Sequence, residues 1–144
     1  MLNADPAEGP ISSVRVALAG PGPTADYYFV HPVDIPGVTL HDVAALLDAA
    51  RAAPRAGAVL PSVSGRRAHP VLLRAALVPQ VLALAHGATL RDLWRSPEVE
   101  LVHVELQNPW LRFDVNTPED YQELLAHWPG GTPARAAGDG SQQS

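Results

Sequence analysis

The order of hydrophobic and polar positions along the chain predicts strands that alternate with helices. Nearly continuous apolar runs at residues 26–33 and 56–63 are typical of strands buried on both faces. Residues 100–106 alternate apolar and polar side chains, which predicts a strand with one exposed face. The same alternation predicts a last short strand at residues 113–116.

Two helices are clearly signalled. Residues 39–53 begin with Thr and carry Asp three residues later, which is the spacing of a capping box. The apolar stripe expected to face the core comprises Leu40, Val43, Ala44 and Leu47. Residues 117–128 begin with Thr-Pro-Glu-Asp, which supplies a cap, a proline at the first helical position and the closing carboxylate.

Other segments are less distinct. Residues 12–18 suit a short helix or a strand, residues 71–85 suit a helix interrupted at Pro79, and residues 88–94 suit another short helix. Residues 65–70, of sequence GRRAHP, are expected to form a loop.

Alternating strands and helices predict an α/β fold with a mostly parallel sheet covered by helices on both faces. In such folds ligands lie beyond the carboxyl ends of the strands, so both polar strand-to-helix junctions are expected at the ligand edge. A length of 144 residues indicates one domain, here over residues 1–128, and the Pro-, Gly- and Ser-rich residues 129–144 are expected to form a disordered tail.

Composition narrows the function. The net charge of −5 provides no basic face for a phosphate backbone, so we expect no nucleic-acid partner. All ten basic residues are arginine and cysteine is absent, which excludes lysine and thiolate chemistry by this chain. Without a leader pattern or a long apolar segment, we expect no membrane contact and a soluble, cytoplasmic protein.

Asp34 stands in the first junction, within the sequence PVDIP. An oxygen ligand fixed just after a buried strand suits Mg²⁺, which uses one or two protein ligands and takes the rest from water and phosphate. The carboxylate can instead close its own turn by hydrogen-bonding the backbone near Gly37. Both interpretations remain open from the residues alone.

The second junction contains Asp114 and Asn116, which share one face of the predicted strand. Helix capping does not explain them, because they precede the cap. The Asn116 carbonyl oxygen is a candidate second Mg²⁺ ligand. The alternative is a pair of local hydrogen bonds that tie strand to helix.

The loop at residues 65–70 is the third candidate. Its two adjacent arginines, Arg66 and Arg67, offer guanidinium groups that bind phosphate oxygens in pairs, although they can equally be solvated surface residues. His69 precedes a proline, so its backbone is extended and its ring can reach into a cleft or simply pack. The remaining histidines show no metal-ligand spacing.

Together the ordered motifs PVDIP, GRRAHPVLL and FDVNTPEDY resemble those of the MobA-like NTP transferase family, which includes molybdenum cofactor cytidylyltransferases and guanylyltransferases. The stretch LNADPAEGPISSVRVAL also resembles that family, so the likeness covers about residues 2–128. It implies a three-layer α/β/α, Rossmann-like nucleotidyltransferase fold.

The resemblance also implies roles. Asp34 and Asn116 would hold the Mg²⁺ of CTP or GTP, while a phosphorylated acceptor such as molybdopterin displaces pyrophosphate. Gly65, Arg67, His69 and Asp114 would contact substrate. Ala68 replaces the usual second glycine of this loop, and its methyl group would restrict the loop if that position required a positive φ.

One departure is marked. The family's glycine-rich segment resembling LAAGxSxRMGxxK, with its lysine, has no counterpart here, so the resemblance describes an N-terminally truncated domain with an unpaired strand edge beside Asp34. That edge invites pairing with a partner or a second copy. The alternatives are a non-catalytic degenerate or truncated module that binds a partner or ligand, and a relative that transfers nucleotides to sugar phosphates.

Overall fold

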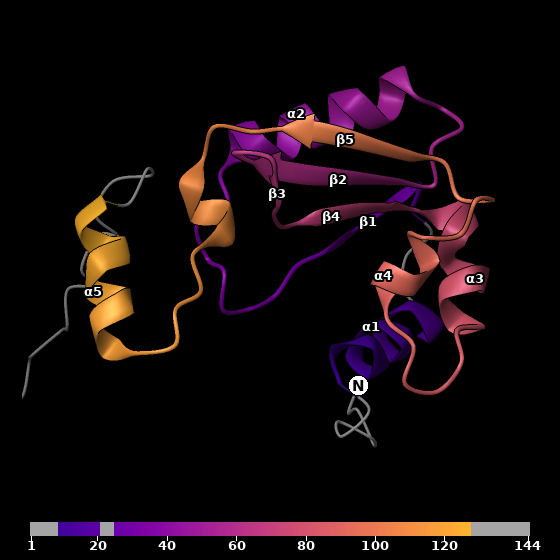
Figure 1. The fold of residues 1–144 in the computed structure, drawn as a ribbon, viewed down its shortest axis with the longest axis horizontal. Helices are drawn as coiled ribbons and strands as arrows, with labels where there is room; N and C mark the ends of the chain where they lie inside the picture. Colours follow the sequence, from indigo (N-terminus) through magenta and orange to yellow (C-terminus); the bar gives the residue numbers. More distant parts are fainter. Residues whose placement is uncertain (1–8, 21–24, 128–144) are drawn as a thin grey trace, which may run out of the picture.

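A computed structural model describes residues 9–20 and 25–127 of the chain, and they form one mixed sheet with helices on both faces (Figure 1). The strands are β1 (Tyr27–Val30), β2 (Ala58–Val63), β3 (Arg66–Arg67), β4 (Val71–Arg74) and β5 (Leu101–Glu105). The α-helices are α1 (Pro10–Ala19), α2 (Leu40–Ala52), α3 (Val78–Leu82), α4 (Leu90–Leu93) and α5 (Pro118–His127). Two 3₁₀ turns complete the elements, η2 (Ala75–Leu77) and η3 (Pro109–Arg112).

The sheet is mostly antiparallel, so the expectation of a mainly parallel sheet was wrong. β4 lies between β1 and β2 and runs antiparallel to both, β3 pairs with β2 as a hairpin, and β5 is parallel to β2. The cause is residues 71–74, which were expected to be helical and instead form β4, because a short apolar run suits a buried strand as well as a helix.

The common edge of strand ends, where we expected ligands to bind, nevertheless exists. β1 and β2 are both antiparallel to β4, and β5 is parallel to β2, so these three strands point the same way. Their carboxyl ends therefore meet at one edge of the sheet. The segments that follow β1 and β5 carry the two acidic junctions to this edge.

The two faces of the sheet have separate cores. On one face, α2 packs Leu46 and Ala50 against a cluster that includes Val59 and Leu72. On the other face, α1, α3 and α4 form a cluster around Leu73. Since Leu72 and Leu73 are consecutive in β4, their side chains point to opposite faces, and this produces the three layers visible in Figure 1.

The buried face of α2 differs from the predicted stripe. Leu40 is 88% exposed, whereas Asp42 is only 2% exposed and Leu46 is fully buried. The capping box itself is present, with Thr39 and Asp42 bonding each other's backbone N–H groups. The helix is therefore rotated so that its capping carboxylate enters the protein.

Strand β1 also differs from its prediction, because it is an edge strand rather than one buried on both sides. Its burial is intermediate, and Phe29 is 40% exposed. Among the described residues β1 pairs only with β4, which leaves its other edge unpaired, as the sequence led us to expect. Pairing of that edge with a partner stays a prediction.

Residues 113–116 have no strand partner within the described ranges, so the last predicted strand was wrong. They form an extended connection from η3 to α5. The helix expected after them is confirmed, since the side chains of Thr117 and Asp120 exchange the predicted capping hydrogen bonds with the backbone. Residues 12–18, which suited either a helix or a strand, belong to helix α1.

Two remaining expectations concern the ends and the membrane. The predicted tail, residues 129–144, lies outside the described residues. Within residues 9–20 and 25–127, no helix combines the length and apolar character needed to cross a bilayer.

The packing of α2 gives a stability prediction with a matched control in the same helix. Leu46→Ala should lower the free energy of unfolding by about 2–5 kcal/mol, because it opens a cavity at a fully buried position. Leu40→Ala should change it by less than about 0.5 kcal/mol, because that side chain is exposed. Urea unfolding followed by circular dichroism measures both, and equal losses would contradict the rotated face.

Candidate functional site

The turn after β1 presents Asp34 to solvent. The Ile35 N–H donates to the Pro32 carbonyl at 3.4 Å, and the His31 ring contacts the Ile35 carbonyl through Nε2 at 2.6 Å. Because a carbonyl can only accept, Nε2 carries the proton in this contact. Ile35 is 5% exposed and anchors the turn, while Asp34 is exposed and its carboxylate accepts no hydrogen bond from the described residues. The Asp34 carboxylate therefore does not close its own turn by accepting a hydrogen bond from the backbone near Gly37.

Asp114 and Asn116 lie against this turn. The N–H of Val115, between them, donates to the Asp34 carbonyl at 2.7 Å. Asp114 and Asn116 are both exposed, and the Asn116 backbone N–H donates to the capping carboxylate of Asp120 at 3.0 Å. The two acidic junctions, about eighty residues apart in sequence, are thus joined by one backbone hydrogen bond.

His69 belongs to the same group. Its backbone N–H donates to the Leu111 carbonyl at 3.1 Å, which ties the loop before β4 to the segment that leads to Asp114. Burial lowers the pKa of His69 from its ordinary value, and the charge of His31 lowers it further. The carboxylates of Asp114 and Asp34 act in the opposite direction, so all four side chains share one electrostatic environment.

Gly65 and Arg67 belong to the hairpin that β2 and β3 form. Gly65 lies in its turn and Arg67 in β3. Ser64 and Gly65 have φ values of 52° and 69°, which make a tight two-residue turn. Arg66 and Arg67 are exposed, and no described contact joins Arg67 to Asp34 or Asn116. The structure therefore brings Asp34, Asp114, Asn116 and His69 together and leaves Gly65 and Arg67 on the adjoining hairpin.

Ala68 is accommodated without backbone strain. It is not among the residues with positive φ, and its side chain is 4% exposed within the α2-side core. Its N–H donates to the Pro61 carbonyl at 2.9 Å. The restriction expected from replacing the family's glycine does not arise in this conformation.

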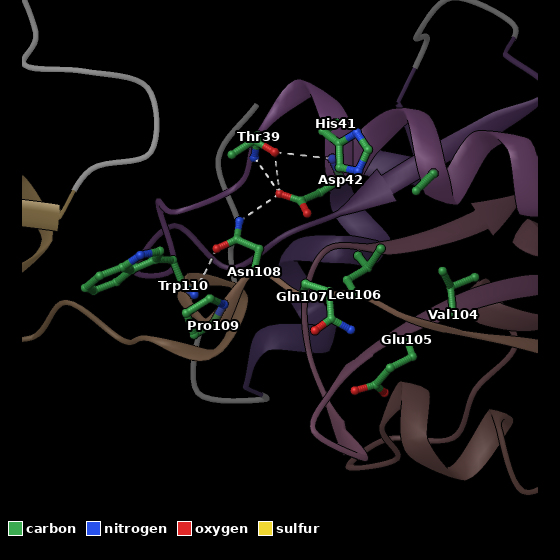
Figure 2. A pocket seen from close by; sticks show the side chains of 11 residues that line it. Thr39, His41, Asp42, Val104, Glu105, Leu106, Gln107, Asn108, Pro109 and Trp110 are labelled. Carbon is green, nitrogen blue, oxygen red and sulfur yellow. Dashed lines mark hydrogen bonds between the residues drawn. The ribbon is translucent and has the colours of Figure 1, made fainter.

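A buried polar clasp, made by Asp42, Asn108 and Gly37, fixes the two junctions relative to each other (Figure 2). Asn108 donates through Nδ2 to the Asp42 carboxylate and to the Gly37 carbonyl, each at 2.8 Å. Its Oδ1 accepts from the Trp110 N–H at 3.1 Å. A Cβ on Gly37 would lie 2.3 Å from the Trp110 Cβ, so only glycine permits this approach.

A cleft of about 570 Å³ opens beside the clasp, between the first turns of α2 and residues 104–110. Its lining includes His41, Glu105 and Asn108, which are labelled in Figure 2. Sequence reasoning assigned no function to these residues or to His31. The position of His31 directly before the Pro-x-Asp turn could have pointed to it in the sequence. No sequence feature points to Asn108.

The donor set suits a hard divalent cation that also binds phosphate. Asp34, Asp114 and Asn116 offer carboxylate and amide oxygens at one edge. No group of three or more His, Cys, Asp or Glu side chains within the described ranges could hold a metal by itself. Mg²⁺ commonly uses one or two protein ligands, which this donor set can supply, and completes its shell from water and phosphate.

Comparison with known proteins shows the family of the chain, over a range that ends before Asp114 and Asn116. The sequence profile of the MobA-like NTP transferase domain matches residues 1–104, and the chain belongs to that family. No curated protein matches the chain.

Three solved structures share the fold. A homolog of Mycobacterium tuberculosis Rv0371c from Mycobacterium sp. strain JC1 is 24% identical, with a TM-score of 0.64 over 80% of this chain and 56% of that one. Rv0371c from M. tuberculosis H37Rv is 22% identical, with a TM-score of 0.64 over 81% and 59%. Its complex with manganese is 23% identical, with a TM-score of 0.62 over 79% and 60%. The chain thus spans less than two thirds of each of these relatives.

The clasp predicts a specific loss of stability. Asn108→Ala removes the donor to the buried Asp42 carboxylate, which should lower the free energy of unfolding by about 2 kcal/mol. Gln107→Ala, at the exposed neighbouring position, should change it by less than about 0.5 kcal/mol. Urea unfolding of the two variants tests this, and a neutral Asn108 variant would contradict the clasp.

His69 predicts a dependence of stability on pH. Its pKa is lowered in the folded state, so the unfolded state binds a proton more readily. The native state should therefore lose stability as the pH falls through the ordinary histidine value of 6.5. The pH-dependence of chemical unfolding between pH 8 and pH 5 should be shallower in His69→Gln than in the wild type. Parallel profiles would show that His69 does not contribute.

Proposed function

We propose that this domain binds the divalent cation complex of a nucleoside triphosphate at Asp34 and Asn116 and takes part in transfer of the nucleoside monophosphate to a phosphorylated acceptor. The supporting observation is the hydrogen bond from Val115 N–H to the Asp34 carbonyl at 2.7 Å, which unites the two junctions at the carboxyl ends of β1 and β5. Membership of the MobA-like NTP transferase family supports the same reaction class.

The cation proposed is Mg²⁺, and the nucleotide CTP or GTP. Bound there, the cation would neutralise charge that develops on the phosphate oxygens. The role of the protein is to place two oxygen donors on hydrogen-bonded segments. The Asp34 turn is closed by Ile35 and His31, and the backbone of Asn116 is held by its N–H bond to Asp120. The manganese complex of Rv0371c supports a divalent cation in a protein of this fold.

The acceptor is proposed to lie toward the hairpin and His69. Arg67 of β3 would bind its phosphate, Gly65 of the same hairpin would contact the acceptor, and Asp114 would contact its polar groups. Burial keeps the His69 ring neutral near pH 7, so it can donate a hydrogen bond without adding charge. Within this proposal an acceptor phosphate oxygen attacks the α-phosphorus, and pyrophosphate leaves. A molybdopterin-type acceptor fits this chemistry, as does a sugar phosphate.

The assignment predicts nucleotide-dependent stabilisation. CTP or GTP with Mg²⁺ should raise the thermal midpoint of the chain, because a ligand at a hundredfold excess over its dissociation constant adds about 2.7 kcal/mol. Asp34→Ala should remove this shift. Asp26→Ala, an exposed carboxylate before the other end of β1, should retain it.

Two results would contradict the assignment. If Asp34→Ala kept the full shift, Asp34 would not hold the cation. If no nucleotide moved the midpoint of a cooperatively folded wild-type chain, the domain would be a module without nucleotide binding.

A further inference from the structure

Glu105, the last residue of β5, contacts the hairpin that carries Arg66 and Arg67. Its Oε2 accepts from the Ser62 hydroxyl at 2.6 Å, and the Gly65 N–H points at both carboxylate oxygens, at 3.3 and 3.4 Å. These hydrogen bonds and one from the Ser64 N–H lower the pKa of Glu105, so the side chain is an anion at neutral pH. The side chain is nevertheless exposed to solvent.

The hairpin turn has the left-handed conformation of a tight two-residue hairpin. Ser64 has a φ of 52°, which is uncommon for a residue other than glycine. The Gly65 N–H faces the carboxylate of Glu105, which belongs to a different strand. The turn is therefore bonded to β5 through an anionic side chain.

We propose that Glu105 is a positioning residue that holds the β2–β3 hairpin in the geometry with which Arg67 and His69 receive the phosphate of the acceptor. The inference rests on the proposed function, because it concerns the acceptor half of that site. β5 leads directly to Asn108 and on to Asp114, so Glu105 ties the hairpin to the strand that also positions the cation side.

Charge alone predicts the opposite effect of Glu105 on phosphate binding. Glu105 carries a negative charge close to two arginines, and simple repulsion would make its neutralisation strengthen anion binding. Solvent screens that repulsion at an exposed site, whereas the hydrogen bonds fix the backbone on which the arginines stand. The sign of the change in anion affinity therefore separates positioning from repulsion.

The test compares Glu105→Gln with Glu100→Gln, the same substitution at an exposed residue just before β5. Inorganic phosphate is the probe for the hairpin, because the acceptor is proposed to place a phosphate there, and Mn²⁺ alone is the probe for the cation site. Both are followed by calorimetry of the 144-residue chain. Amide exchange at Ser64 and Gly65, measured by NMR, reports the turn itself.

For Glu105→Gln we expect amide exchange at Ser64 and Gly65 to be faster by about three- to tenfold, because charged hydrogen bonds are about twice as strong as neutral ones. The affinity for inorganic phosphate should be weaker by a similar factor. Mn²⁺ affinity should be unchanged, and Glu100→Gln should match the wild type throughout. If Glu105 contributed only to stability, Glu105→Gln would lower the thermal midpoint and would affect the affinities for both probes equally.

Several results would overturn the inference. Unchanged or tighter phosphate binding by Glu105→Gln would do so, as would equal loss of Mn²⁺ and phosphate affinity. Absence of phosphate binding in the wild type, with Mn²⁺ and nucleotide binding intact, would overturn it while leaving the proposed cation site standing. Loss of phosphate affinity in Glu105→Gln in a chain that binds no Mn²⁺ would support the inference and contradict the cation site.

Discussion

The arrangement of the site depends on the hydrogen bond between the Asn108 amide and the buried carboxylate of Asp42. Asp42 also closes the capping box of α2, so one oxygen accepts from the Thr39 N–H, the Thr39 hydroxyl and Asn108. A buried carboxylate is costly unless such donors surround it. The Asn108 amide also donates to the Gly37 carbonyl. The residue that pairs with Asp42 therefore also holds the chain after β1 against the chain after β5. The requirement to pair one buried charge thus sets the position of both junctions.

Around that constraint, each side of the site is supported by an element of different origin. The proposed cation side lies on two segments joined by the Val115–Asp34 backbone hydrogen bond. The proposed acceptor side lies on a hairpin whose left-handed turn faces the carboxylate of Glu105. His69 lies between them, bonded through its backbone to Leu111 and influenced by charges from both sides. Such convergence of loops on a rigid sheet is how α/β domains commonly build ligand sites.

Local chemistry made some features predictable from the sequence and left others hidden. The capping residues Thr39 and Thr117 were recognisable because a cap needs only its own neighbours, and Asp34 because a carboxylate after an apolar strand is conspicuous. The direction of β4 was not predictable, since Val71 to Leu73 suit either a strand or a helix. The burial of Asp42 was missed because it depends on Asn108, which is sixty-six residues away. Long-range pairing of polar groups leaves no periodic pattern in the chain.

The central claim is that Asp34 and Asn116 form one cation site although they belong to different segments. Titration of the isotopically labelled chain with paramagnetic Mn²⁺ tests it most directly, because bound Mn²⁺ broadens the NMR signals of nearby nuclei. The account predicts that the amides around Asp34 and those around Asn116 broaden together at the lowest Mn²⁺ concentrations, with His69 affected as well. Early broadening at only one of the two junctions would contradict it. So would broadening that appears first at Glu98 and Glu100, in the loop before β5.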